Sequence, residues 1–270
     1  MAIVASPFRY ILIAILLASS ALFTICQASS KDEVEHQMPF NYEVTDNVKG
    51  PNKWGTLKPE WRSCGDGKLQ SPIDMINERV KVLPSLKSLK IVYKTAPAKI
   101  ANRGHDISVG WEGNAGGAII NGTYYKLANI HWHSPSEHTV NGTRYALEGH
   151  LVHKSADGSI AVIGILYKIG LPDPFLTQVL GKTKNITEEG TSVGDVSPRE
   201  IKFSRNKYYR YLGSLTTPPC TEGVIWTLVK KVRTVSLEQL NALKEAVHDG
   251  YEKNARPVQD IYTRTINTSS

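Results

Sequence analysis

The sequence is poor in cysteine, and after its first residues it has no long apolar run. Three cysteines among 270 residues are too few for a disulfide-rich scaffold. Beyond residue 28, no apolar stretch is long enough to span a bilayer. The formal net charge is +7, but the basic residues are dispersed and are not interleaved with aromatic side chains. The chain therefore shows no signature of a nucleic-acid-binding protein or of a membrane-spanning mature protein.

The N-terminus has the layout of a cleaved secretory signal. Arg9 is followed by an apolar run from Tyr10 to about Cys26, and small residues surround Ala28. A membrane anchor is the alternative, but the run is short for a spanning helix and is interrupted by two serines. We expect residues 1–28 to be removed and the mature protein to follow the secretory pathway.

The two cysteines outside this signal are Cys64 and Cys220. In an oxidising compartment we expect them to form one disulfide, which stabilises by ~4 kcal/mol in the chain-entropy picture. Two free buried thiols are the alternative. Four glycosylation sequons also suit a secreted chain, and they begin at Asn121, Asn141, Asn185 and Asn267. The first two are Asn-Gly pairs, which predict exposed hairpin tips.

The mature chain is predicted to contain one domain. Residues 29–50 are polar and charged, which indicates a flexible N-terminal arm. Residues 51–262 are long enough for one domain with a substantial core, and they contain no internal repeat. Residues 263–270 are predicted to form a mobile tail.

Strand patterns dominate this domain, so the expected fold is mainly β with short peripheral helices. β-branched and aromatic runs bounded by turn residues are "LKIVYK", "DISVGWE", "GGAIING", "TYYKLANIHWH", "RYALEGHLVHK", "IAVIGILYKI", "YYRYLGSL" and "VIWTLVKK". A short helix is predicted over "DPFLTQVLGKT" and a longer one over "SLEQLNALKEAVHD". The longer helix has Ser236 as its N-cap and an apolar stripe of Leu237, Leu240, Leu243 and Val247.

Five of the eight histidines lie between residues 130 and 153. In a strand, residues two apart share a face, so His131 and His133 point the same way. If the strand that contains His150 runs antiparallel to theirs, the three imidazoles can converge. Three histidines with an open fourth position are typical of a catalytic zinc site.

Two polar residues on the same faces favour this interpretation. Asn129 precedes His131 by two residues, and Glu148 precedes His150 by two. Such side chains accept the second ring N–H of a ligating histidine and fix its tautomer. The alternative is a polar face with surface histidines, which a lone His-x-His indicates more often. His138 and His153 are predicted to be structural, and His36 and His248 to lie on the surface.

Several ordered motifs resemble the α-class carbonic anhydrases, and the earliest ones resemble the plant branch. The motifs are "NKWGTLKPEW", "LQSPID", "HWH", "SEHT", "LEGHLVH", "AVIG", "SLTTPP" and "NARP". The resemblance covers residues 51–262. It implies a large, mostly antiparallel central sheet of about ten strands, with zinc at the base of a conical cleft.

The resemblance also implies a role for individual residues. It makes His131, His133 and His150 the zinc ligands and His105 the proton shuttle. Thr216 would accept a hydrogen bond from zinc-bound hydroxide while it donates one to Glu137. Substrate would contact Thr217 and an apolar wall that consists of Val152, Val162, Leu215 and Trp226. The disulfide of secreted members corresponds to Cys64 and Cys220, in agreement with the pairing expected above.

The implied activity is the reversible hydration of carbon dioxide to bicarbonate and a proton, with Zn²⁺ as the cofactor and a histidine as the proton shuttle. Arg103 replaces the asparagine that is usual near the shuttle, and we expect its charge to lower the pKa of His105. The sequence fits a protein secreted to the cell wall or rerouted to another organelle. The alternative is a storage, defence or carbohydrate-binding protein on the same fold with weak or no anhydrase activity.

Overall fold

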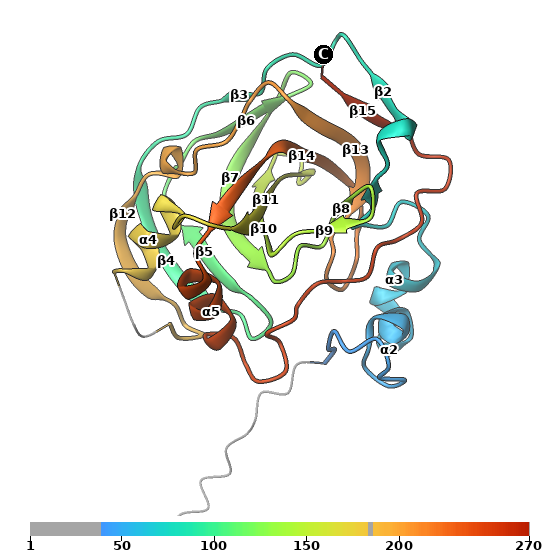
Figure 1. Ribbon diagram of the computed structural model, residues 1–270, viewed down its shortest axis with the longest axis horizontal. Coiled ribbons are helices and arrows are strands. Elements are labelled where there is room, and N and C mark those ends of the chain that lie inside the picture. The colour runs from blue at the N-terminus through green and yellow to red at the C-terminus, as the bar shows by residue number, and fades with distance from the viewer. Residues whose placement is uncertain (1–38, 183–185, 270) are drawn as a thin grey trace, which may run out of the picture. The chain divides into compact units, whose positions relative to one another are not determined.

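The computed structural model describes residues 39–182 and 186–269 (Figure 1). Some of the expectations above concern residues outside these ranges: the secretory signal with Cys26, the histidine at 36, and the sequon at Asn185.

A mixed sheet of twelve strands forms the framework of the domain. The strands follow the order β12-β4-β5-β7-β10-β11-β14-β13-β15-β2, with β3 and β6 paired beside β7. Most neighbours are antiparallel, but β11 pairs in parallel with β14, and β15 with β2. The predicted mainly β fold with a large, mostly antiparallel sheet is therefore confirmed.

The strands of this sheet have the following bounds. The strands in the first half of the domain are β2 (Val80–Val82), β3 (Lys90–Ile91), β4 (Ala96–Asn102), β5 (Ile107–Trp111), β6 (Gly117–Ile120) and β7 (Thr123–His133). Those that follow are β10 (Leu147–Lys154), β11 (Ile160–Ile169), β12 (Thr191–Val196), β13 (Tyr208–Ser214), β14 (Glu222–Val235) and β15 (Ile266–Thr268).

Smaller elements surround the main sheet (Figure 1). A three-stranded sheet contains β1 (Asp74–Met75), β8 (Thr139–Val140) and β9 (Thr143–Arg144). The α-helices in the described residues are α2 (Trp54–Leu57), α3 (Ser63–Asp66), α4 (Pro174–Leu180) and α5 (Leu237–Glu245). Short 3₁₀ turns cover η1 (Pro51–Lys53), η2 (Pro59–Trp61), η3 (Asn77–Arg79) and η4 (Pro198–Glu200).

The two predicted Asn-Gly hairpins are present. Asn121 and Gly122 join β6 to β7 with φ angles of 50° and 86°. Asn141 and Gly142 join β8 to β9 with φ angles of 46° and 74°. Positive φ at both central residues is the geometry of a type I′ turn, whose twist matches that of the paired strands. The turn chemistry thus fixes the register in which β7 starts.

Helix α5 begins where its sequence predicts and ends earlier. The Ser236 hydroxyl accepts from the Gln239 backbone N–H, and the Gln239 side chain accepts from the Ser236 N–H, which completes a capping box. Leu240 and Leu243 are buried as expected. Leu237 is 53% exposed, so its place in the apolar stripe was wrong. As the first helical residue it lies at the edge of the packed face.

The segment expected to be a flexible arm is partly folded. Phe40 and Tyr42 are buried in an aromatic cluster together with Trp54. Two aromatic side chains within five residues outweigh the polar composition of the arm, because each buries a large apolar area. The predicted disulfide between Cys64 and Cys220 belongs to this cluster, with a Cα–Cα distance of 5.1 Å, and is confirmed.

The segment expected to be a mobile C-terminal tail is also ordered. Strand β15 pairs antiparallel with β13 and parallel with β2. Ile266 is fully buried, and the Thr268 hydroxyl donates to the Tyr208 carbonyl oxygen over 2.9 Å. The tail was misjudged because a three-residue strand carries almost no pattern of its own and is held by its neighbours.

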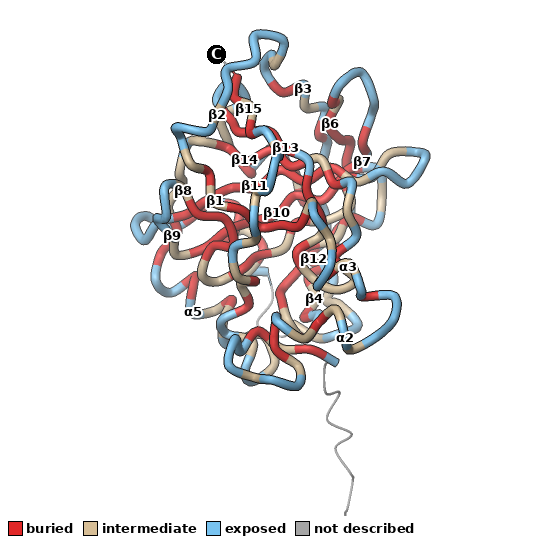
Figure 2. Tube along the Cα trace, turned by 90° about the vertical axis from the view of Figure 1, so that its right-hand side faces the viewer, coloured by how far each residue is buried: buried red, intermediate tan, exposed pale blue. Residues whose placement is uncertain are grey.

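Hydrophobic clusters cover both faces of the sheet, and Figure 2 shows the buried strands inside a shell of exposed loops. The larger cluster contains Ile130, Trp132 and Leu151, which alternate with the candidate ligands along β7 and β10. The cluster on the other face contains Val152, Val162 and Trp226. None of the helices among the described residues is long and apolar enough to cross a membrane.

Candidate functional site

Strands β7 and β10 bring three histidines together. The two strands are antiparallel, and His150 lies directly opposite His131, while Glu148 lies opposite His133. Because residues two apart share a face, all three imidazoles project from the same side of the sheet. One ring nitrogen from each of the three lies within 4.8 Å of the other two. The expected convergence of the three rings is therefore present in the structure.

In each ring, the nitrogen that points away from the other two rings is hydrogen-bonded to a different oxygen. The distance from His131 Nδ1 to Asn129 Oδ1 is 3.0 Å, and that from His150 Nε2 to Glu148 Oε1 is 2.9 Å. His133 Nδ1 donates to the backbone oxygen of Asn254 over 2.7 Å. These contacts leave His131 Nε2, His133 Nε2 and His150 Nδ1 to face one another.

The three inner nitrogens suit a metal ion. His133 Nε2 is buried and has no hydrogen-bond partner among the described residues. A buried, unpaired nitrogen costs free energy unless something binds it. Burial lowers the pKa of both His131 and His150, although the carboxylates near each ring act in the opposite direction. Neutral imidazoles are the form that binds zinc, so the donor set fits a three-histidine zinc centre.

Glu148 connects the metal candidates to a buried hydrogen-bond network. Its Oε1 lies 2.9 Å from His150 Nε2 and 2.7 Å from His138 Nδ1. Its Oε2 accepts the backbone N–H groups of Glu137 and His138. Burial would raise the pKa of Glu148, but the charges of His138 and His150 and their side-chain hydrogen bonds to it hold that pKa well below its usual value. His138, Glu148 and His150 are thus joined by hydrogen bonds in this structure.

The far side of His138 is also satisfied. Its Nε2 lies 2.6 Å from the Tyr211 hydroxyl, which in turn lies 2.8 Å from Ser71 Oγ. A chain of buried polar groups therefore runs from His150 through Glu148 and His138 to Tyr211. The structure agrees with the interpretation of His138 as a structural residue.

The expected hydrogen bond between Thr216 and Glu137 is not formed. Glu137 Oε1 accepts the backbone N–H of Arg256 over 2.9 Å. Glu137 Oε2 is buried and has no hydrogen-bond partner among the described residues. Thr216 is buried as well, but its hydroxyl makes no bond to this carboxylate. The structure thus leaves an unpaired carboxylate oxygen where the sequence had placed a hydroxyl donor.

His105 lies in the turn between β4 and β5. Its Nδ1 lies 3.1 Å from the backbone oxygen of Arg103, and its ring packs against Phe40. The Arg103 guanidinium is paired with the buried carboxylate of Asp106, whose Oδ2 also lies 3.5 Å from His105 Nε2. The pKa of His105 is lowered as expected, but mainly by burial; Asp106 raises it, and Arg103 contributes only after these two.

The residues expected to form an apolar wall lie in one cluster. Val152, Val162 and Trp226 are buried there, and Leu215 packs against them half-buried. The Trp226 ring lies 4.8 Å from the His150 ring, and its Nε1 donates to the Ser214 carbonyl oxygen. The wall therefore adjoins one of the three convergent histidines. Thr217 is half-buried and follows Thr216 in the chain.

Two residues of the "NARP" stretch have roles at the site that the sequence did not assign. The Asn254 backbone oxygen accepts from His133, and its side chain donates to the backbone oxygens of His105 and Trp132. The Arg256 backbone N–H donates to Glu137, while its guanidinium bonds Gln70, Ser71 and Cys64. The motif could be seen in the sequence, but its contacts to His133 and Glu137 use backbone groups, which the residue types do not reveal.

The remaining histidines lie away from this centre. His153 is fully buried on the opposite face, where its Nε2 lies 2.8 Å from the Tyr93 hydroxyl. His248 is half-buried, and its Nε2 lies 2.8 Å from Glu188 Oε1, so it is less exposed than predicted.

A Gly-x-Ser-x-Gly spacing occurs at residues 190–194, but it does not form a nucleophile elbow. Such an elbow is a sharp strand-to-helix turn that presents the serine to a histidine. Here the stretch enters β12, which pairs antiparallel with β4. The Ser192 hydroxyl accepts from the Gly194 N–H. The serine is therefore a strand residue without the required geometry.

The described sequons differ in access. Asn121 is exposed at the tip of the β6–β7 hairpin. Asn141 is exposed at the tip of the β8–β9 hairpin, and its Oδ1 accepts the Asn77 N–H. Asn267 lies within β15, and the two residues that complete its sequon, Thr268 and Ser269, are buried. Asn121 and Asn141 are thus the exposed asparagines among the described sequons.

Comparison with known proteins identifies one family. The family model described as eukaryotic-type carbonic anhydrase matches residues 49–270. Alpha carbonic anhydrase 4 of Arabidopsis thaliana is 54% identical over 234 residues, which are 87% of each chain.

Solved structures agree with this result. A structure of dioscorin complexed with ascorbate matches with a TM-score of 0.82 and 43% identity, covering 85% of this chain and 97% of that one. The α-carbonic anhydrase of Thermovibrio ammonificans, solved with the inhibitor sulfanilamide, matches with a TM-score of 0.74 and 34% identity, covering 84% and 98%.

Proposed function

The chain belongs to the eukaryotic-type carbonic anhydrase family, and we propose that it interconverts carbon dioxide and bicarbonate at a zinc ion held by His131, His133 and His150. The observation that carries this proposal is the convergence of three imidazole rings. In each ring the outer nitrogen is already hydrogen-bonded, and the inner nitrogen faces the other two rings. A histidine cluster without a ligand role would use its inner nitrogens in hydrogen bonds as well.

Zinc, when bound, supplies a Lewis acid that makes a water ligand acidic near neutral pH, and carbonic anhydrases are the standard case of this effect. The protein's own contribution is orientation. Asn129, Glu148 and the Asn254 carbonyl fix the tautomer and direction of each imidazole. The buried partners of Glu148 keep it ionised, so it can hold the proton of His150 Nε2 in place.

We assign Thr216 to the orientation of the attacking oxygen. Glu137 Oε2 is a buried acceptor that has no partner among the described residues, so a hydroxyl that donated to it in the working site would satisfy it. A threonine hydroxyl that donates to this carboxylate can only accept from the reacting oxygen, because it has a single proton. The lone pair of that oxygen is then directed toward the substrate.

We assign the apolar cluster of Val152, Val162 and Trp226 to carbon dioxide, with Leu215 at its edge. Carbon dioxide has no net charge, so an apolar wall beside His150 holds it without competing with the polar groups. Thr217 is proposed to contact the bicarbonate product.

His105 is the proposed proton shuttle. It is partly accessible and is not one of the three convergent rings. Burial lowers its pKa, so it releases a proton readily at neutral pH. The backbone oxygen of His105 accepts from Asn254, which connects the shuttle loop to the residue that orients His133.

A non-enzymatic role on the same fold is the second candidate, and the similarity to dioscorin, whose structure is described as complexed with ascorbate, favours it. The two readings differ in the metal centre. A storage or ligand-binding protein has no need for three histidines with oriented outer nitrogens and free inner ones. The intact centre therefore favours the enzyme.

We propose that the protein acts in the secretory pathway or outside the cell. The Cys64–Cys220 disulfide supports this location, because such bonds persist in oxidising compartments.

The decisive experiment measures zinc content and carbon dioxide hydration on the same purified mature protein. We expect one zinc per chain and hydration that disappears when a chelator removes the metal. The Thr216→Ala variant should keep zinc and lose most of the hydration. Full zinc occupancy without hydration would favour the non-enzymatic role, and equal losses of zinc and hydration in Thr216→Ala would make Thr216 structural.

A further inference from the structure

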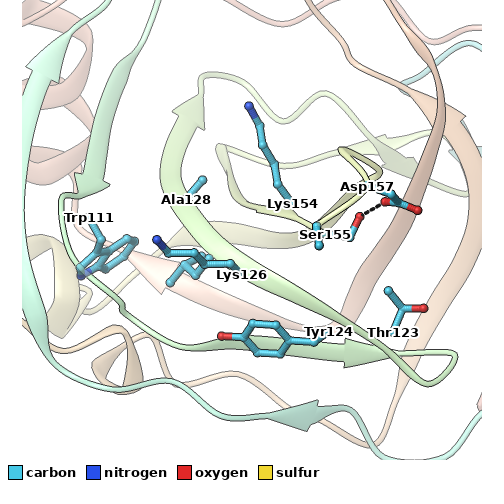
Figure 3. Close-up of a pocket in the computed structure, with 10 residues that line it drawn as sticks. Trp111, Thr123, Tyr124, Lys126, Ala128, Lys154, Ser155 and Asp157 are labelled. Carbon is cyan, nitrogen blue, oxygen red and sulfur yellow. Dashed lines mark hydrogen bonds between the residues drawn. The ribbon is translucent and has the colours of Figure 1, made fainter.

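A pocket lies at the end of β7 that is opposite from the candidate zinc ligands (Figure 3). Its volume is about 800 Å³, and none of the three convergent histidines lines it. The wall comes from the end of β5, the first half of β7 and the turn that follows β10. Pockets of this size are large enough for a small organic ligand.

Two lysines in the wall occupy directly opposed positions on paired strands. Lys126 on β7 is the direct partner of Lys154 on β10. Side chains of directly opposed residues point to the same face, and like charges in that position destabilise a sheet. Neither lysine has an acidic partner within ion-pair distance in the part of the chain that the structure describes. The pocket therefore contains two positive charges that form no ion pair in the described part of the chain.

The strands are distorted where the pocket lies. Asn129 pairs with Val152 and Leu127 with His153, so Ala128 is an extra residue that opposes nothing on β10. A bulge of this kind bends a strand and redirects the neighbouring side chains. The bulge makes Ala128 part of the pocket wall and brings Lys126 into register with Lys154.

The remainder of the wall is largely apolar. Trp111, Leu127 and Ala128 line it together with Tyr124, whose side chain is 44% exposed. In Figure 3 the side chain of Lys126 extends toward Trp111, so a charge and a flat ring lie at one side of the pocket. The acidic residue of the wall, Asp157, is engaged by Ser155 Oγ and the Ser159 N–H and does not pair with the lysines.

We propose that this pocket binds a small aromatic carboxylate. The carboxylate would lie between Lys126 and Lys154, where it removes their repulsion, and the ring would lie against the apolar wall beside Trp111 and Tyr124. An inorganic anion alone would leave the apolar wall exposed to water, and a neutral aromatic molecule would leave the lysines unpaired. The ligand therefore needs both a carboxylate and an aromatic ring.

The test uses the full mature protein loaded with zinc and 2-naphthoate as the probe, titrated by calorimetry. We expect one site per chain in this pocket. The double variant Lys126→Gln/Lys154→Gln should bind at least about tenfold more weakly, because charge-assisted contacts to both lysines are lost. Tyr124→Ala should also weaken binding, whereas the matched exposed variant Lys168→Gln on β11 should not. Unchanged affinity in the double variant would overturn the proposal.

Three further measurements separate this pocket from the zinc centre and from simpler ligands. His131→Ala should bind 2-naphthoate as the unmodified protein does, and loss of binding there would place the probe on the metal centre. Binding of 2-naphthalenemethanol or of inorganic phosphate with equal affinity would refute the need for ring and carboxylate together. Hydration by the double lysine variant should be normal, so a failure of this proposal leaves the proposed activity untouched.

Discussion

Strands β7 and β10 place histidines on both of their faces, and the two faces use them differently. On one face, His131, His133 and His150 each have one nitrogen bonded and the other directed at its neighbours. On the opposite face, His153 has both nitrogens engaged: Nε2 by the Tyr93 hydroxyl at 2.8 Å and Nδ1 by the Ala161 carbonyl oxygen at 3.3 Å.

The comparison shows that burial does not by itself make a histidine a ligand. His153 and His133 are both fully buried. They differ in their hydrogen bonds. His133 Nε2 has no partner among the described residues, whereas both ring nitrogens of His153 have one. A satisfied ring stabilises the core, and a ring with one free nitrogen can bind a metal.

We expect the largest effect from replacing one histidine on each face. His133→Ala should abolish stoichiometric zinc binding and hydration, because two imidazoles remain of the three-histidine set. His153→Phe should retain zinc and lose ~1–3 kcal/mol of unfolding free energy, because it leaves the Tyr93 hydroxyl without its partner. Metal analysis and chemical denaturation of both variants measure these outcomes. Zinc retained by His133→Ala, or lost by His153→Phe, would end the distinction between the faces.

The next effect concerns the residues that orient the rings. Glu148→Gln should weaken zinc binding by about 10–100-fold, because the amide cannot hold His150 and His138 as the carboxylate does. Glu112→Gln is the matched control, since Glu112 is an exposed residue paired with Lys99 on the surface. Competition with a chelator gives the affinities. Equal affinities for the two variants would show that the outer hydrogen bonds do not support the metal centre.

A smaller effect appears in the dependence of stability on pH. Burial lowers the pKa of His153 to about 4 from 6.5, so the folded protein holds the ring neutral. The contribution of His153 to stability is thus present above pH 6.5 and is lost as the pH falls toward 4. Between pH 7 and 5.5 the expected loss is about 1 kcal/mol, and His153→Phe should not show this share.

Urea unfolding at the two pH values measures that difference. His248→Gln is the control, because its half-buried ring lies away from both faces and the variant should keep the full pH dependence. If His153→Phe loses as much stability as the unmodified protein over this range, the buried ring is not the group that titrates.

The smallest effect is expected at His105. His105→Ala should reduce turnover in dilute buffer about tenfold or less, leave zinc content unchanged, and recover when imidazole is added to carry the proton. Stopped-flow hydration at several buffer concentrations measures this. An unchanged turnover without any response to imidazole would remove His105 from the proton path, and would leave the three inner histidines as the chemically active rings.

The sequence was most informative where a residue's role depends on its immediate neighbours. The predicted bounds of β7 and β11 agree with the structure, and both Asn-Gly hairpins are present. Strands β4 and β12 were not predicted, because alanine, glycine and Pro97 weaken their patterns and pairing with neighbours stabilises them. Part of the expected arm proved to be packed through Phe40 and Tyr42, and the expected tail proved to be strand β15.

By itself, the sequence determined the alternation that places His131 and His133 on one face and His153 on the other, because a strand has a period of two. It also determined the capping box of α5 and the turns at Asn121 and Asn141. Only the tertiary structure decided which ring nitrogens stay free, since the backbone oxygen of Asn254 and the second hydrogen bonds of Glu148 come from distant or folded segments. It also decided that Lys126 opposes Lys154. Contacts of this kind depend on the register of strands and on segments far apart in the sequence, and neither is encoded by any one stretch of the chain.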